Sequence, residues 1–254
     1  MVLIGAHTGS GAPLAEAATS GADLVQIFLG DPHSWQKPAP RADAAELRSA
    51  GIPIYVHAPY LMNLASPHNR IRIPSRTTLA NAVEAAEAIG ASGLIVHGGH
   101  VGEDEDIGVG FERWRKALET FESAVPILVE NTAGGGNAVV REMANYGPLW
   151  EAIGDRNVGV CLDTCHAWAG GAQLETAVEV VSGLTGRIDL VHCNDSRDEH
   201  GSGRDRHANL GQGAIPADLL VAVVAAAGAP VVVETPGESA DHAADIVWLR
   251  RHLA

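Results

Sequence analysis

Eight short apolar runs recur along the chain, and each of them ends in a polar cluster. Every run is rich in Val, Ile and Leu and stops at His, Asp, Glu, Asn or Gly. Such runs are typical of parallel strands that are buried on both faces. Because helical segments separate them, they predict an α/β fold of the (β/α)₈ class, a TIM barrel with a metal site at the carboxyl ends of its strands. The runs are, in order, VLIGAH, DLVQIFLG, IPIYVHAPY, GLIVHGGH, PILVENTAG, VGVCLDTCH, IDLVHCNDS and PVVVETPG.

The segments between the runs predict helices that cover such a barrel. Residues 79–90 are rich in alanine and end at Gly90, a typical C-terminal stop. Residues 111–123 place aromatic and leucine side chains at spacings of three or four, which forms an apolar stripe on a helix. Residues 217–227 show the same pattern. We therefore expect helices over these three ranges.

Three other connections do not have the pattern of a plain helix. Residues 30–40 contain an isolated Trp35, residues 60–76 carry two prolines and three arginines, and residues 194–213 are polar and rich in glycine. Each range follows a predicted strand, and long loops at the carboxyl ends of barrel strands are where substrate recognition is built. We expect all three ranges to be loops beside the site.

Length and composition indicate one globular domain inside the cell. The 254 residues have the size of a single barrel and no linker divides them, so we expect one domain over residues 1–254. We expect no signal peptide, and no apolar run is long enough to span a bilayer, which argues against a membrane protein. The three cysteines are expected to be free thiols in a reducing compartment. These features favour the cytoplasm.

The net charge of −14 argues against a simple nucleic-acid-binding protein, because phosphate recognition usually needs a basic surface. Bound divalent cations would cancel many carboxylates at the place where a phosphate would lie. The charge is therefore compatible with a metal-dependent enzyme that acts on phosphate esters.

Nine ionisable side chains lie at or after the ends of strands three to eight. Because the carboxyl ends of parallel strands meet at one face of a barrel, we expect all nine to lie close together. A single His there is more often structural, and Asp or Glu often caps a helix. Independent structural roles, however, would not concentrate at six successive strand ends. The nine residues are His57, His97, Glu130, Asp163, His166, His192, Asp205, His207 and Glu234.

Nitrogen and carboxylate oxygen atoms form the donor set of catalytic Zn²⁺ or Mn²⁺. Nine donors are too many for one metal ion, whereas three ions that share bridging carboxylates would use all of them. A multi-metal cluster suits phosphodiester hydrolysis, since one ion lowers the pKa of a water while others hold the attacked and leaving oxygens.

The other polar residues near the strand ends have simpler explanations. His7 and His100 are candidates for supporting the ligands through hydrogen bonds. Cys161 is expected to point toward the helices, and Cys165, although beside a ligand, is not expected to bind metal. Five further histidines are expected to be solvated, namely His33, His68, His200, His242 and His252.

The assembled motifs resemble those of endonuclease IV, the family of zinc-dependent apurinic/apyrimidinic endonucleases. The stretches CLDTCHAWA and GSGRDRHANLGQG are the most specific, and the resemblance extends from residue 4 to about residue 236. The sequence departs from the family at VHGGH, which is shorter here, and at His33, which stands where the family has an arginine that probes DNA. The matching segments are IGAH at 4–7, HAPYLMNLASP at 57–67, VHGGH at 96–100, VENTAGGG at 129–136, GVCLDTCHAWAGG at 159–171, HCNDSRDEHGSGRDRHANLGQG at 192–213 and VETP at 233–236.

The resemblance implies a trinuclear zinc centre in which all nine ligand positions are filled, with Mn²⁺ as an alternative at one site. Glu130 would bridge two of the ions. The ligands would divide into His57, His97 and Glu130 for the first ion, Asp163, His192 and Glu234 for the second, and His166, Asp205 and His207 for the third.

The family also implies hydrolysis of the phosphodiester 5′ to an abasic site in double-stranded DNA, which leaves a 3′-hydroxyl and a 5′-deoxyribose phosphate. Glu130 or Glu234 would orient the attacking water. An abasic nucleotide loses little stacking when it is extruded, which would select the lesion. Contacts with DNA are expected from Tyr60 and Leu61, the pair that the family inserts at the lesion, and from Trp35, His33, Arg70 and Arg72.

Two other functions fit parts of the pattern. A non-catalytic protein that grips damaged DNA would not need a full ligand shell. A single-metal sugar isomerase or epimerase on the same barrel would leave five of the predicted ligands without a purpose, and it would bind about one metal ion per chain against about three. The isomerase quartet would be Glu130, Asp163, His192 and Glu234.

For the nuclease we expect a monomer, because the enzyme must reach around a duplex.

Overall fold

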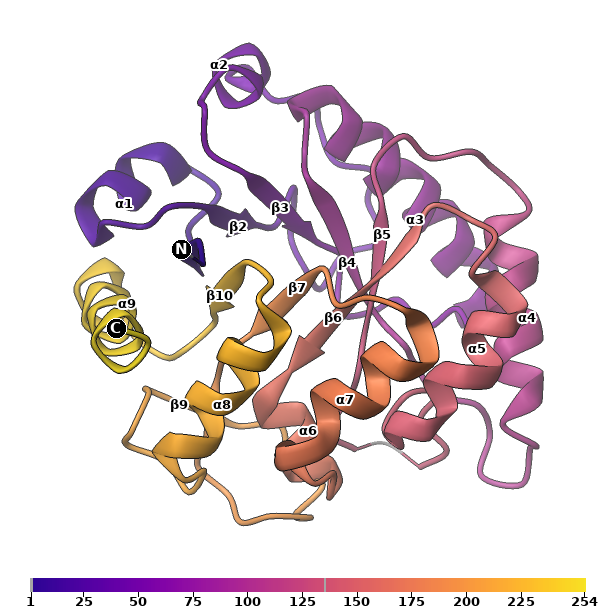
Figure 1. Cartoon of the computed structure of the whole chain (residues 1–254). Coiled ribbons are helices and arrows are strands. Elements are labelled where there is room, and N and C mark those ends of the chain that lie inside the picture. Colours follow the sequence, from indigo (N-terminus) through magenta and orange to yellow (C-terminus); the bar gives the residue numbers. More distant parts are fainter. Residues whose placement is uncertain (1, 135) are drawn as a thin grey trace.

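The computed structural model describes residues 2–134 and 136–254, which form a closed barrel of eight parallel strands with helices around it (Figure 1). Met1 and Gly135, the latter in the VENTAGGG motif, lie outside the described residues. Each strand pairs in parallel with both of its neighbours, so the predicted (β/α)₈ class is confirmed. Around the barrel the strands are β1 (Ile4–His7), β10 (Val231–Val233), β7 (Leu190–His192), β6 (Val158–Asp163), β5 (Ile127–Glu130), β4 (Gly93–His97), β3 (Ile54–His57) and β2 (Val25–Ile27).

Helices connect the strands on the outside of the barrel, as parallel strands require. Helix α9 packs against α1, so the two ends of the chain lie on the same side of the barrel (Figure 1). In chain order the helices are α1 (Pro13–Ser20), α2 (Ala44–Arg48), α3 (Asn69–Ile89), α4 (Gly108–Leu118), the 3₁₀ turn η1 (Met143–Asn145), α5 (Tyr146–Ile153), α6 (Thr164–Gly170), α7 (Leu174–Thr185), α8 (Ala217–Ala227) and α9 (Ser239–His252).

The three predicted helices correspond to α3, α4 and α8. Helix α8 has the predicted bounds, 217–227, and ends at Gly228 in the left-handed conformation that suits glycine. Helix α4 ends at Leu118, earlier than predicted, and Phe121 packs on the core from beyond the helix. The helical stripe was therefore predicted correctly, although its last residues do not belong to the helix.

The loop predicted over residues 60–76 is wrong in its second half, because α3 already begins at Asn69. Pro74 lies inside this helix, where it lacks a backbone N–H donor. The helix continues through the proline because Ser75 and Leu79 start a line of buried residues that packs on the barrel. Tertiary packing thus outweighs the local signal of the proline.

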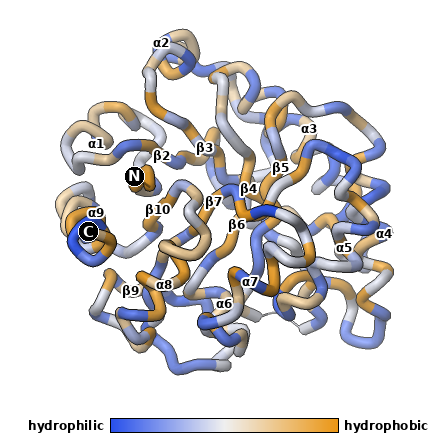
Figure 2. Tube along the Cα trace, in the orientation of Figure 1, coloured by the Kyte–Doolittle hydropathy of each residue, from blue (hydrophilic) through white to orange (hydrophobic). Residues whose placement is uncertain are grey.

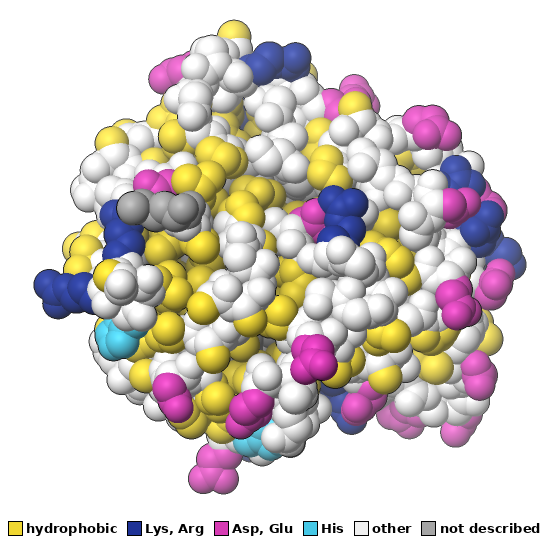
Figure 3. Space-filling model, viewed as in Figure 1, with side chains coloured by type: hydrophobic (Ala, Val, Ile, Leu, Met, Phe, Trp, Pro, Cys, Tyr) yellow, Lys and Arg dark blue, Asp and Glu magenta, His cyan; other side chains and the backbone are white. Residues whose placement is uncertain are grey.

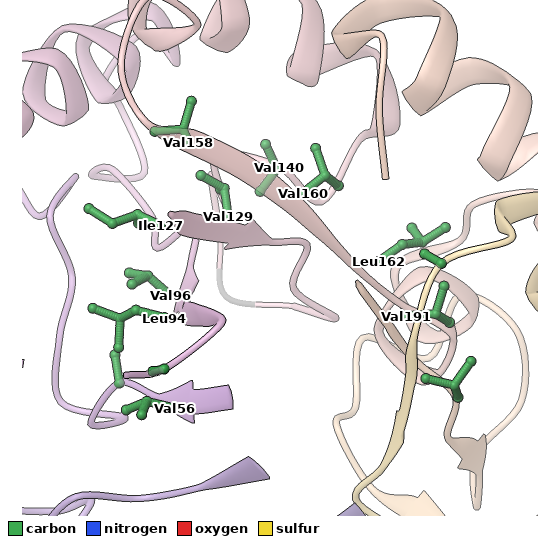
Figure 4. Close-up of a cluster of buried hydrophobic side chains, with 14 of the residues drawn as sticks. Val56, Leu94, Val96, Ile127, Val129, Val140, Val158, Val160, Leu162 and Val191 are labelled. Carbon is green, nitrogen blue, oxygen red and sulfur yellow. The ribbon is translucent and has the colours of Figure 1, made fainter. Parts of the chain in front are cut away.

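Side chains along the strands alternate between the helix layer and the barrel interior. Outward residues such as Val56, Val96 and Val129 form the main core (Figure 4). Trp114 of α4 is completely buried in this core, and its Nε1–H donates a hydrogen bond of 2.8 Å to the carbonyl oxygen of Gly98. Hydrophobic residues accordingly concentrate on the central strands, and hydrophilic residues on the outer loops (Figure 2).

Inward side chains form a second, smaller cluster inside the barrel. In β1 the corresponding inward position is Gly5, where a Cβ atom would lie 1.9 Å from the carbonyl oxygen of Leu24. Cys161 belongs to this cluster, so its predicted position among the helices is wrong. The alternation that points Asp163 inward also points inward the residue two positions earlier. All three cysteines are free thiols, as predicted, and all three are buried. The cluster comprises Leu24, Tyr55, Ile95, Leu128, Cys161, Leu190 and Val232.

The surface reflects the acidic composition of the sequence, which has 31 acidic and 17 basic residues. On the face that carries the N-terminus and the end of α9, acidic side chains appear at many points and basic side chains are dispersed (Figure 3). Among the described residues, no helix combines the length and apolar character needed to cross a membrane.

Candidate metal centre

A ring of eight inward-pointing polar side chains closes the carboxyl end of the barrel, one from the end of each strand. Each follows an inward residue of the layer below, or Gly5, by two positions, as Glu130 follows Leu128. The strand alternation that builds the interior therefore also aims the polar ring into the same space. Six members are predicted ligands, and two are not. The ring consists of His7, Gln26, His57, His97, Glu130, Asp163, His192 and Glu234.

His166 joins the ring from α6, the helix that follows β6. The carboxylate of Asp163 caps this helix by accepting a hydrogen bond of 2.6 Å from the backbone N–H of His166. The same Asp is thus both a helix cap and a member of the ring, and its cap fixes the first turn on which His166 stands. Both side chains are almost completely buried.

Asp205 and His207 come from the loop after β7, which remains irregular as predicted apart from two short strands. These strands, β8 (Asp195–Ser196) and β9 (His207–Ala208), pair in antiparallel fashion and fold the loop back over the barrel. The buried carboxylate of Asp195 accepts hydrogen bonds from three backbone N–H groups between residues 211 and 215, which holds the return of the loop in place. All nine predicted ligands therefore meet at one face.

Glu130 lies at the centre of the cluster and is completely buried. Its Oε2 lies 3.2 Å from Nε2 of His57 and 3.2 Å from Nε2 of His97. Its Oε1 lies 2.9 Å from Nδ1 of His192 and 3.3 Å from Nδ1 of His166. One carboxylate thus contacts four of the five predicted histidine ligands.

The other carboxylates surround the remaining donor atoms. Glu234 Oε2 lies 3.1 Å from His192 Nδ1, and Asp205 lies 3.2 Å from His166 Nε2 and 3.1 Å from His207 Nε2. Several groups of these side chains have donor atoms that all lie within 4.8 Å of one another. Three groups contain only imidazoles and carboxylates, namely His57, His97 and Glu130; Glu130, Asp163, His192 and Glu234; and Asp163, His166 and His207. Two groups include a buried thiol, namely Glu130, Cys161 and His192; and Cys165, Asp205 and His207.

Imidazoles and carboxylates in this cluster stabilise each other's charge. Burial opposes ionisation of Glu130, but His192 and His97 outweigh burial and hold the pKa of Glu130 well below its usual range. Burial likewise opposes ionisation of Glu234, and His192 again lowers its pKa. Burial lowers the pKa of His207, but the adjacent Asp205 more than reverses this and raises the pKa to about 9. Without metal the cluster therefore holds protons between its carboxylates.

The hydrogen bonds of two histidines leave a ring nitrogen available to bind a metal ion in place of those protons. His57 Nδ1 lies 2.8 Å from the carbonyl oxygen of Ala58, and His207 Nδ1 lies 3.1 Å from that of Glu234. Because a carbonyl only accepts, Nδ1 carries the proton and Nε2 of the neutral ring offers a lone pair. His207 Nε2 is buried and makes no hydrogen bond, although Asp205 Oδ1 lies 3.1 Å away. A lone pair that faces a carboxylate oxygen brings two acceptors together in a buried site, and a cation between them would remove this repulsion.

Two buried amide side chains support the ligands and were not predicted. Asn194 donates from Nδ2 to Asp163 Oδ2 at 2.7 Å, and its Oδ1 accepts from the backbone N–H of Glu234 at 2.7 Å. Gln26 contacts His192 and Glu234. The available signal was a polar amide inside or directly after an apolar run, where burial requires hydrogen bonds.

Three other histidines show mixed outcomes. His7 lies 3.6 Å from Glu234 and contacts Gln26, which supports its predicted auxiliary role. His100 is exposed and lines a hollow beside the cluster. His242 was predicted to be solvated, which is wrong, because its ring is buried with Nε2 3.0 Å from the carbonyl oxygen of Thr235.

Two hollows adjoin the cluster, and Tyr60 lines both of them. The larger, of about 820 Å³, lies beside Glu234 and His207, and the smaller, of about 370 Å³, lies beside His97 and His166. The Tyr60 side chain is 49% exposed, and its ring centre lies 6.0 Å from that of His97. Tyr60 thus stands directly beside the candidate metal site and remains accessible from outside.

The other residues predicted to contact DNA have different surroundings. Leu61 lines the smaller hollow, and the His33 ring centre lies 5.7 Å from that of Tyr60. Trp35 is exposed on the loop after β2. Arg70 is exposed at the start of α3, whereas Arg72 is half-buried and donates a hydrogen bond of 2.6 Å to the carbonyl oxygen of Ser66 and another to Asn69.

Comparisons with known proteins agree with this geometry. The family described as "Xylose isomerase-like TIM barrel" matches residues 14–252. A protein named "Probable endonuclease 4" from Mycobacterium bovis (strain BCG / Pasteur 1173P2) is 59% identical over 98% of both chains, and one from Mycobacterium leprae (strain Br4923) is 55% identical over 98% of both. The crystal structure of endonuclease IV from Thermus thermophilus has a TM-score of 0.85 at 31% identity and covers 99% of this chain and 98% of that one. A D-tagatose 3-epimerase-like protein has a TM-score of 0.79 at 19% identity, over 99% of this chain and 97% of that one, which reflects the shared fold alone.

Proposed function

The chain belongs to the endonuclease IV family of metal-dependent nucleases, as its motifs predicted, and we propose that it cleaves DNA at abasic sites. The reaction is hydrolysis of the phosphodiester 5′ to the lesion in a duplex, which leaves a 3′-hydroxyl and a 5′-deoxyribose phosphate. The observation that carries the proposal is the convergence of nine side chains with nitrogen or oxygen donors at one face of the barrel, where Glu130 contacts four of the histidines.

Three zinc ions would occupy these groups, and Mn²⁺ could replace one of them. Bound zinc would supply Lewis acidity, which lowers the pKa of water and neutralises charge on phosphate oxygens. The thiols of Cys161 and Cys165 lie beside these donors, but burial raises the pKa of each to about 12, so both stay protonated and the donors are nitrogen and oxygen. The first ion would take His57, His97 and Glu130, and the second Glu130, Asp163, His192 and Glu234. The third would take His166, Asp205 and His207, because Asp205 lies within 3.2 Å of both imidazoles.

Two carboxylates at this centre differ in their access to substrate. Glu130 is completely buried and contacts histidines on both of its oxygens, so it holds ligands together. Glu234 lines the larger hollow, and its side chain is 13% exposed. We assign to Glu234 the orientation of the attacking water and to Glu130 the bridging of two metal sites, since only Glu234 can reach a molecule in the hollow.

The hollows on either side of Tyr60 suit the recognition of a missing base. An abasic nucleotide has no base to unstack, so its extrusion from a duplex loses less energy than that of a normal nucleotide. Tyr60 and Leu61 would fill the gap in the base stack, with Trp35 and His33 on the neighbouring loop. Arg70 is free to contact a phosphate, whereas Arg72 would first have to release its bonds to Ser66 and Asn69.

A labelled duplex with one stable abasic-site analogue tests the proposal, with an undamaged duplex of the same sequence beside it. We expect incision directly 5′ to the analogue, loss of incision after treatment with phenanthroline, and recovery on addition of zinc. The Tyr60→Ala variant should lose more activity on an abasic site in a duplex than on one in a flexible, already unstacked strand. It lacks the side chain that would fill the gap in the base stack. Absence of incision by a protein loaded with three zinc ions would contradict the proposal.

A sugar isomerase or epimerase is the alternative with structural support, since the quartet that it needs is one of the groups described above. It would leave five predicted ligands without a function, although their donor atoms lie within the same cluster. These ligands are His57, His97, His166, Asp205 and His207. We therefore favour the nuclease and propose that it acts as a monomer.

A further inference from the structure

Gln26 is a member of the polar ring that is not a predicted ligand, yet its side chain contacts three other members of the ring. Gln26 is completely buried in β2, one residue before the strand ends at Ile27. Nε2 lies 2.6 Å from Glu234 Oε1 and 2.9 Å from His7 Nδ1, and Oε1 lies 2.7 Å from His192 Nε2. One amide thus joins two candidate metal ligands that come from different strands.

The charge of Glu234 determines which way this amide points. A carboxylate oxygen accepts hydrogen bonds and repels another acceptor, so the group 2.6 Å from it must be the amide N–H₂. The second N–H of the same nitrogen then points to Nδ1 of His7, which accepts it in the neutral ring. With both N–H groups engaged, the amide oxygen is the atom that faces His192.

This orientation dictates the proton position on His192. The amide oxygen only accepts, so Nε2 of His192 must carry a proton. Nδ1 of the neutral ring then has its lone pair directed into the cluster, where Glu130 Oε1 lies 2.9 Å away and Glu234 Oε2 lies 3.1 Å away. The nitrogen that could bind a metal is thereby presented together with two carboxylate oxygens.

We propose that Gln26 is a positioning residue for the metal site formed by Glu130, Asp163, His192 and Glu234. It fixes the Nε2–H tautomer and the ring orientation of His192, and it holds Glu234 with Oε2 turned toward that site. The inference rests on the proposed function in so far as this group binds metal. Partners of this kind typically change metal affinity by roughly 10- to 100-fold, and we expect an effect of that size.

His7, the other ring member that is not a predicted ligand, lies directly beside Gln26. His7 occupies the adjacent place in the ring, its ring centre 4.5 Å from that of Phe28, and it lies 3.6 Å from Glu234. Its Nδ1 lies 2.9 Å from Gln26 Nε2, so with the amide oriented as above this nitrogen accepts a hydrogen bond and the ring is neutral. The two residues that β1 and β2 contribute therefore form a neutral support beside the charged ligands of the other strands.

The Gln26→Leu variant tests the inference, because leucine has a similar volume and makes no hydrogen bonds. Tyr55→Phe serves as the matched control, since Tyr55 points into the same barrel interior one layer below. Zinc affinity is measured by competition with a calibrated chelator, and the His192 tautomer by long-range ¹H–¹⁵N spectra of histidine-labelled, zinc-loaded protein. We expect one zinc site of the variant to weaken roughly 10- to 100-fold, whereas the control keeps the wild-type affinities.

The tautomer is measured on the wild-type protein as well, so the test does not depend on the folding of the variant. A proton on Nε2 of His192 is expected there, and a proton on Nδ1 would overturn the inference. Equal zinc affinities in Gln26→Leu and wild type would also overturn it, while leaving the nuclease proposal intact. A wild-type protein that binds no zinc at this group would instead contradict the proposed function.

Discussion

Metal binding by His166, Asp205 and His207, the proposed ligands of the third ion, should depend steeply on pH. The pKa of His207 is raised to about 9 beside Asp205, so at pH 7 about 1% of this imidazole is neutral. A metal ion needs the neutral ring and must displace the proton. From His207 alone, the apparent affinity should therefore rise about tenfold per pH unit from pH 7, about 100-fold in all, and level off above pH 9. A histidine of ordinary pKa would give a change of less than about twofold over the same range.

The pKa of His166 strengthens this dependence. Burial lowers it, but Asp163 and Asp205 more than reverse the effect, so its pKa also lies well above the usual value. We therefore expect more than one proton to be released for each ion bound at pH 7. Calorimetry in two buffers of different ionisation enthalpy counts these protons, and chelator competition at pH 7, 8 and 9 gives the affinities.

Two variants of the same loop separate the cause from a general effect of charge. Asp205→Asn removes the carboxylate that raises the pKa of His207, so binding should weaken and its pH dependence should flatten. Asp198→Asn is the control, because Asp198 pairs with Arg206 and not with a ligand, and it should keep the wild-type slope. A wild-type affinity that changes less than twofold between pH 7 and pH 9 would refute the reasoning.

Substitutions at three further positions have defined outcomes, two of them with a control variant elsewhere in the chain. Trp114→Ala should lower the free energy of unfolding by about 3–5 kcal/mol, measured by chemical denaturation, whereas the exposed Trp35→Ala should change it little; equal effects would contradict the account of the core. Asn194→Leu should weaken zinc binding roughly 10- to 100-fold without a change in circular dichroism, and unchanged binding would exclude a supporting role. Gly5→Ala should prevent folding, because its Cβ would lie 1.9 Å from a backbone oxygen. Gly183→Ala, whose Cβ would meet nothing within 4 Å, should instead stabilise helix α7 by about 0.5–1 kcal/mol. A normally folded Gly5→Ala protein would show that the interior is less tightly packed than described.

The sequence predicts the barrel and its ring well because both arise from one regularity. Each strand alternates between the helix layer and the interior, so a polar residue two positions after an inward apolar one enters the same space. Glu130 after Leu128 and His192 after Leu190 are instances that the eight runs already contain. The same rule, applied to Cys161 and Asp163, would have placed that thiol correctly inside the barrel.

The remaining features depend on contacts between distant segments. Gln26 and Glu234 are 208 residues apart in the chain, and no local pattern announces their hydrogen bond. The helix around Pro74 forms because of the barrel surface beneath it, against its local preference. His242 is buried because α9 packs its first turns over the end of β10, where Thr235 accepts its hydrogen bond.

The number of zinc ions per chain tests the central claim most directly. It can be measured by native mass spectrometry on protein purified without chelator and then supplied with zinc. The arrangement of nine donors around Glu130 predicts three ions, and Glu130→Ala, which removes the ligand shared by two groups, should lower that number. A single ion in the wild-type protein, unaffected by replacement of His57 or His207, would contradict the trinuclear centre and favour a single-metal enzyme.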